Sequence, residues 1–191
     1  MQYLTISLDG IDDARLLHDW QWLLSESYRL LAVTRMGDAF VEKADGEVVF
    51  LDTLEGVLKH AATNENGFFK LLKAGELDPT WFNSNMVALL EARSEHLAPG
   101  QCYCYKVPPI LGGSFESANV KAVSAMVHFS IMGQLREQTR HRRQAPRSAS
   151  SKSLSRDTAI HCGASHRSLV CKGTRGGHLA ALARVCYWHI R

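Results

Sequence analysis

The net charge changes sign near residue 140, and this limits which part of the 191-residue chain can pack into a domain. Residues 1–140 contain 12 basic residues against 18 acids, a balance of −6, whereas residues 141–191 contain 10 basic residues and one acid, a balance of +9. The second segment is rich in Arg, Ser, His and Cys and lacks a steady apolar period, so it cannot bury enough apolar surface to offset its ordering entropy. We predict one domain over residues 1–140 and a disordered or irregular basic tail over residues 141–191.

The first 140 residues carry the patterns of a mixed domain. Asp45-Gly46 between two β-like runs is the strongest short signal for a hairpin, and Asn64 and Gly75 are suited to begin and end a helix. The expected strands are 2–8, 31–34, 39–42, 47–51, 102–107 and 119–131, with 54–58 continuing the sheet. The expected helices are 12–28, 65–73, a segment beginning at 78, and 132–138. This order predicts an α+β fold, a single small domain with a mainly antiparallel sheet and flanking helices.

The composition argues against several classes of protein. No apolar run is long enough for a membrane helix, and the N-terminal MQYLTISLDG lacks the basic and apolar stretches of a secretory signal. The patterned part holds only Cys102 and Cys104, which share a strand face and are poorly placed for a mutual disulfide. We therefore expect a reduced, cytoplasmic protein without membrane contact. The acidic balance of residues 1–140 argues against direct nucleic acid binding by that domain.

Three segments carry unusual strings in a fixed order. They are Trp20–Leu24 (WQWLL), Leu31–Gly56 with its Gly37-Asp38-Ala39-Phe40, and Gln101–Gly113 (QCYCYKVPPILGG) followed by Asn119, Val127–Ser130 and Gly133-Gln134. Together they resemble the immunity-protein domain of type VI secretion DNase immunity proteins. In that family the domain often follows a GAD-like N-terminal domain. The resemblance covers about residues 14–139, and we expect the stand-alone form because the chain has no room for the second domain.

The family resemblance implies a bacterial protein that binds and neutralises a cognate protein toxin delivered between competing cells. Many members of the family are known only as a domain of unknown function. The family pattern normally ends soon after Gly133-Gln134 in a short polar tail, and this sequence departs from it at about residues 138–143, where the composition also changes. Our hypothesis is that residues 141–191 are the product of a frameshift or a misread 3′ end. A basic nucleic-acid-binding arm is the alternative.

No chemical motif in the sequence predicts catalysis. There is no nucleophile elbow, phosphate loop or dinucleotide-binding motif. Asp38, Asp45 and Asp52 are interpreted as turn or cap residues, and His128 as a core or edge histidine of the expected strand 119–131. The histidines and cysteines of the tail fit no familiar zinc-site spacing. We predict no catalytic residue, no cofactor and no metal, and therefore a protein that is not an enzyme.

The same segments supply candidates for a partner-binding surface. Trp20 and Trp22 are two apart on an expected helix and cannot both face one core, so Trp22 is available to a partner. Tyr103 and Tyr105 share one strand face, where exposed aromatic rings would anchor a protein contact. Gly112-Gly113 is interpreted as a turn that needs positive φ or close backbone approach. The full set of candidates is Trp22, Asp38, Asp52, Tyr103, Tyr105, Gly112 and Gly113. A small-ligand-binding regulatory domain with a pocket near residues 108–113 remains the alternative function.

Overall fold

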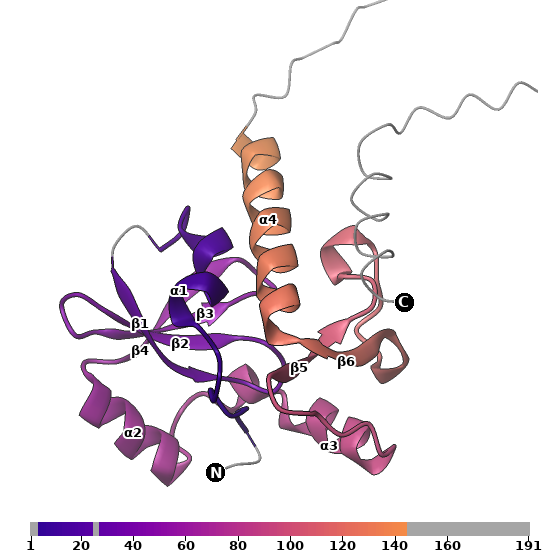
Figure 1. Ribbon diagram of the computed structural model, residues 1–191, viewed down its shortest axis with the longest axis horizontal. Helices are drawn as coiled ribbons and strands as arrows, with labels where there is room; N and C mark the ends of the chain where they lie inside the picture. Colours follow the sequence, from indigo (N-terminus) through magenta and orange to yellow (C-terminus); the bar gives the residue numbers. More distant parts are fainter. Residues whose placement is uncertain (1–3, 25–26, 145–191) are drawn as a thin grey trace, which may run out of the picture. The chain divides into compact units, whose positions relative to one another are not determined.

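The computed structural model describes residues 4–24 and 27–144, which fold into two antiparallel sheets with helices around them (Figure 1). The strands are β1 (Tyr28–Val33), β2 (Ala39–Lys43), β3 (Val48–Asp52), β4 (Val57–Ala62), β5 (Gln101–Tyr105) and β6 (Val120–Ser124). The α-helices are α1 (Asp13–Leu16), α2 (Glu65–Ala74), α3 (Ser84–Ala92) and α4 (Ala125–Gln144). Short 3-10 helices are η1 (His18–Trp20), η2 (Pro79–Phe82), η3 (Pro109–Leu111) and η4 (Ser117–Asn119). The α+β class predicted from the sequence is confirmed.

The larger sheet is a meander in which β1, β2, β3 and β4 pair in sequence order. The predicted hairpin at Asp45-Gly46 is confirmed, because Gly46 N donates to Lys43 O and Asp45 Oδ1 accepts from Glu47 N. One face of this sheet is covered by aromatic rings that contact one another. The rings in that group are Phe40, Phe50, Phe68, Trp81 and Phe82. Apolar burial of this kind is the main stabilising contribution to a domain of this size.

The smaller sheet pairs β5 with β6 and leads directly into α4, which follows β6 without a break in Figure 1. Several hydrogen bonds join this half to the N-terminal part of the domain. Tyr103 N donates to Arg35 O at 2.7 Å, and Trp20 Nε1 donates to Phe129 O at 3.0 Å. The short segment between β1 and β2 therefore lies where both sheets and α4 meet.

Five expected elements differ in the structure. Within the described part of residues 2–8 only one isolated bridge forms, between Thr5 and Thr34. The expected helix 12–28 is reduced to α1 and η1, and the helix expected from residue 78 is divided into η2 and α3 at Asn83, where φ is 43°. The expected strand 119–131 ends at Ser124, and the helix expected at 132–138 is only part of α4.

Burial explains the error at residues 125–131. The buried positions Ala125, Phe129, Met132 and Leu135 recur every three or four residues, which is the period of a helix face. Tertiary packing of this face overrides the strand preference of the local sequence Val127-His128-Phe129. The predicted tail over residues 141–191 lies almost wholly outside the described residues. Within the described part of the chain, no helix is both long and apolar enough to cross a membrane.

Candidate functional site

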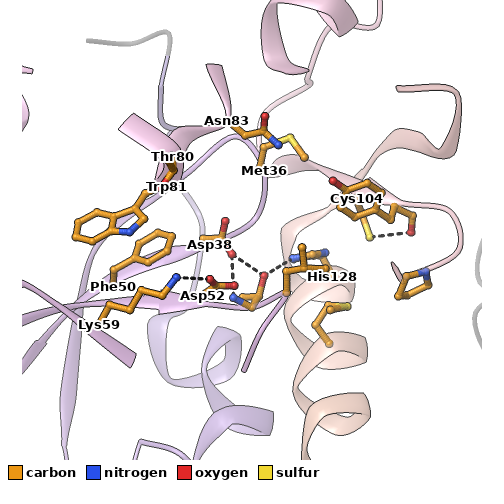
Figure 2. Close-up of a pocket in the computed structure, with 15 residues that line it drawn as sticks. Met36, Asp38, Phe50, Asp52, Lys59, Thr80, Trp81, Asn83, Cys104 and His128 are labelled. Atoms are coloured by element: carbon orange, nitrogen blue, oxygen red, sulfur yellow. Dashed lines mark hydrogen bonds and ion pairs between the residues drawn. The ribbon is translucent and has the colours of Figure 1, made fainter. Parts of the chain in front are cut away.

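A cavity of about 140 Å³ opens where the β1–β2 connection, the end of β3, η2, β5 and α4 meet (Figure 2). Its lining combines charged, aromatic and amide side chains. The members that matter for its chemistry are Asp38, Asp52, Lys59, Phe50, Trp81, Asn83, Tyr105 and His128. These residues come from five separate stretches of the chain, so only the tertiary fold brings them together.

Asp38 is the central polar group of the cavity. Its Oδ1 accepts two hydrogen bonds from Thr53, one from the backbone N and one from Oγ1, both at 2.8 Å. Within the described residues no hydrogen bond reaches Oδ2, and Figure 2 shows this oxygen directed toward Met36 and Asn83. Burial, together with the neighbouring charge of Asp52, raises the pKa of Asp38 to about 7.

Asp52 and Lys59 form an ion pair at the side of the cavity. Lys59 Nζ lies 2.8 Å from Asp52 Oδ2, and this hydrogen bond raises the pKa of Lys59. Asp52 also accepts from Glu55 N at 2.8 Å, as expected of a residue in a turn. The lysine charge is thus matched by Asp52, and its effect on the pKa of Asp38 is smaller than the opposing effect of Asp52.

His128 closes the cavity on the α4 side. Its Nε2 lies 2.9 Å from Gly37 O and 3.2 Å from Thr53 Oγ1. Because a carbonyl oxygen only accepts, we place the ring proton on Nε2. Nδ1 is then an acceptor, and it is buried without a hydrogen-bond partner among the described residues. Burial lowers the pKa of His128 to about 4, so the ring is neutral at pH 7 and adds no positive charge beside Asp38.

Gly37 allows this close contact with His128. Its φ is +83°, a conformation that residues with a Cβ rarely adopt. A Cβ at this position would overlap the His128 ring. The glycine that precedes Asp38 is therefore required by packing as well as by backbone conformation.

Three of the seven predicted partner-binding residues line the cavity, namely Asp38, Asp52 and Tyr105. Trp22 lies elsewhere, stacked on the fully buried Trp20 with ring centroids 5.9 Å apart. The guanidinium carbon of Arg140 lies 5.4 Å from the centre of the Trp22 ring. Trp22 is therefore half-buried within the domain, not displayed on an open surface.

The expectation that Tyr103 is an exposed anchor is wrong. Its side chain is fully buried beside Val87, Leu90 and Val120, and its hydroxyl donates to Glu95 O at 2.6 Å. Strand β5 is covered on both faces, since Cys102 on the opposite face is also fully buried. Tyr103 is consequently a core residue. Tyr105, two residues later, keeps partial exposure at the cavity.

Gly112 and Gly113 form a turn, as predicted. Gly112 has φ of +91° and ends η3, and a Cβ on Gly113 would overlap the backbone carbonyl of Val107. Asn119 holds this loop in place: its Nδ2 donates to Val107 O at 2.8 Å and to Ser114 O at 2.7 Å, while its Oδ1 accepts from Val107 N at 3.1 Å. The two glycines shape the loop and lie outside the cavity lining.

Sequence reasoning missed Thr53, Lys59, Trp81 and Asn83 as parts of one site. In the sequence, Trp81 has the pattern of an ordinary apolar helix position. The contact between Lys59 and Asp52 depends on the register of β3 and β4, in which Asp52 pairs with Val57. Asn83 reaches the cavity from the break between η2 and α3, which the sequence read as one continuous helix. A weak local signal of that break is Asn83 itself, because Asn tolerates the left-handed conformation better than most residues.

Residues 62–136 match the family model described as T6SS immunity protein Tdi1, C-terminal. Over these residues the match confirms the family resemblance found in the sequence. A crystal structure of Atu4351 from Agrobacterium tumefaciens is similar over 63% of this chain at 17% identity, with a TM-score of 0.41, and the chain spans 63% of the length of that structure. No curated protein matches the chain.

Proposed function

We propose that this protein is an immunity protein that binds and neutralises a cognate toxin used in competition between bacteria, with a DNase as the toxin class. The observation that carries the proposal is the match of residues 62–136 to the T6SS immunity family. The match begins at Ala62, the last residue of β4, and ends within α4.

 Lys59 itself precedes the matched residues, whereas Trp81, Tyr105 and His128 of the cavity lie within them.

The charge of the domain supports this proposal. Residues 1–140 carry a balance of −6, and a DNase presents a basic surface to the phosphates of its substrate. Opposite charges on two partners speed their encounter and disfavour wrong partners. Binding of this kind needs no chemical step, so the proposed function is inhibition by contact and not catalysis.

The test is co-expression with the toxin that the adjacent gene is expected to encode. Cells that make the toxin should stop growing, and cells that also make this protein should grow normally and yield a complex of the two proteins. A variant in which several surface acids of the domain are replaced by their amides tests the charge argument, because it should bind the toxin more slowly than the wild type. If the neighbouring gene encodes no toxin and the protein protects no cell, the proposal is lost.

A small-ligand-binding regulatory domain is the second candidate, because the cavity is lined by Pro108 and Tyr105, close to the predicted pocket near residues 108–113. The volume of about 140 Å³ disfavours it. Pockets for whole small-molecule ligands typically measure roughly 300–1,000 Å³. A metabolite found by mass spectrometry after denaturing the purified protein would favour this second candidate.

A further inference from the structure

The Asp38 cavity has an acceptor to which none of the described residues donates a hydrogen bond. Oδ1 of Asp38 is held by Thr53, while Oδ2 is directed across the cavity in Figure 2. Lys59 is engaged by Asp52, and His128 is neutral at pH 7. A partly buried carboxylate without a matched charge is costly, so it favours a ligand that brings both a positive charge and N–H donors.

The walls of the cavity suit a flat cation. The rings of Phe50 and Trp81 are stacked with centroids 4.8 Å apart and an interplanar angle of 10°, and Tyr105 lies in the same lining. A guanidinium group is planar, so it stacks on aromatic faces and donates two parallel hydrogen bonds to a carboxylate. An ammonium group is not planar and makes both kinds of contact less well. The chemistry therefore favours guanidinium over a lysine-type ammonium.

The size of the cavity fits one side chain. Its volume of about 140 Å³ is close to the roughly 150 Å³ of an engineered protein cavity that holds benzene. A guanidinium group with part of its aliphatic stem occupies a space of this order. A nucleotide does not.

The surroundings of the cavity indicate that a protein presents this group. Phe115 is 61% exposed and contacts Tyr105 edge to face with centroids 5.9 Å apart, and Val107 is 48% exposed. Both lie on the loop that Asn119 holds in place. Exposed apolar side chains on a fixed loop beside a charged pocket are typical of a protein-binding surface. A free small cation would leave them uncovered.

We propose that the cavity receives an arginine side chain of the toxin, whose guanidinium group binds the carboxylate of Asp38 while Phe115 and Val107 pack against the surrounding toxin surface. This inference rests on the proposed function. It names the chemical group through which the toxin is recognised.

The first test uses the full chain and a defined probe. N-acetyl-arginine methylamide is titrated against the ¹⁵N-labelled protein, with the citrulline analogue as a neutral probe of the same shape. The arginine probe should shift the amide signals around Thr53 saturably, with an affinity at least tenfold above that of the citrulline probe. Equal binding of both probes, or shifts confined to other parts of the domain, would overturn the proposal. This comparison needs no variant and so does not depend on how a mutant folds.

The second test uses Asp38→Asn and a matched control. The substitution keeps Oδ1 as an acceptor for Thr53 and removes the charge, whereas Glu76→Gln removes an equal charge from an exposed residue outside the cavity lining. Asp38→Asn should weaken binding of the arginine probe at least tenfold, and Glu76→Gln should leave it unchanged. A folded Asp38→Asn variant that binds the probe as tightly as the wild type contradicts the proposal.

The toxin separates this inference from the proposed function. Asp38→Asn should weaken toxin binding at least tenfold, and one arginine-to-alanine change in the toxin should cause a similar loss that does not add to it in a double-mutant cycle. If the wild type neutralises the toxin and Asp38→Asn binds it equally well, the arginine contact is wrong and the immunity function stands. If no toxin is neutralised, the assignment of the cavity to a toxin arginine fails with the function, whatever the probe does.

Discussion

Asp38 carries a charge at a position where the surrounding protein disfavours it. Its pKa of about 7 in the folded protein lies above the ordinary value of an aspartate, chiefly because of burial. The folded state therefore binds the proton more tightly than the unfolded state does. The contribution of Asp38 to the free energy of unfolding should fall as the pH rises from about 4 to about 7, and above that range this loss is complete.

Asp38→Asn should remove this pH-dependent loss. We expect the variant to be more stable than the wild type at pH 8, by on the order of 2 kcal/mol, and to differ little from it at pH 4. Urea denaturation at both pH values measures the difference, with Glu76→Gln as the control for a lost surface charge. An Asp38→Asn variant less stable than the wild type at pH 8 would contradict the argument from burial.

Gly37 offers a second test at the scale of a residue. Gly37→Ala places a Cβ against His128 in a backbone with positive φ, whereas Gly10→Ala has positive φ but open space around it. The conformational penalty alone is about 1 kcal/mol, and overpacking adds roughly 1–3 kcal/mol. Gly37→Ala should therefore be the more destabilising of the two by chemical denaturation. Equal losses would mean that the His128 ring moves aside without cost.

Helices and strands whose ends are marked by a turn or capping residue could be predicted from the sequence. Elements whose ends depend on packing against residues far away in the chain could not. The Asp45-Gly46 hairpin and helix α2 were found because a turn pair or a capping residue marks their ends. The end of β6 at Ser124 has no such mark, and only burial against the rest of the domain makes the following residues helical. The prediction of a strand over 119–131 failed for that reason.

The cap of α2 gives a test at the scale of an element. Asn64 Oδ1 accepts from Gly67 N at 2.8 Å and satisfies one of the free donors at the start of the helix. Asn64→Ala should lower the free energy of unfolding by about 1 kcal/mol. Asn66→Ala, at an exposed position inside the same helix, should leave stability unchanged or raise it slightly. Thermal or urea unfolding of both variants checks this, and equal losses would contradict the capping role.

At the scale of the whole molecule, the sequence identified some residues of the site but could not show that they lie next to one another. Asp38, Asp52 and Tyr105 were named as candidates for separate local reasons, and the cavity that joins them exists only once β3, β5 and α4 are packed together. Tyr103 was misplaced because strand alternation says which residues share a face and not whether that face is covered. Coverage is a property of the complete fold.

The boundary proposed near residue 140 is also a prediction about the whole molecule. The described residues up to Arg143 form one compact unit by their internal contacts. We expect a chain ending at Gln144 to unfold at the same temperature as the full chain and to bind the arginine probe equally well. Differential scanning calorimetry and the same titration test this. A substantial loss of stability on truncation would contradict the boundary, and salt-dependent DNA binding by the full chain alone would favour the basic arm.

The three hydrogen bonds of Asn119 have a consequence for how such a surface can change in evolution. They fix the path of residues 107–119 through backbone atoms of Val107 and Ser114, independently of the side chains that the loop displays. Exposed positions such as Phe115 can therefore be replaced without altering the backbone beneath them. Such side chains can be exchanged one at a time while the backbone that carries them keeps its path.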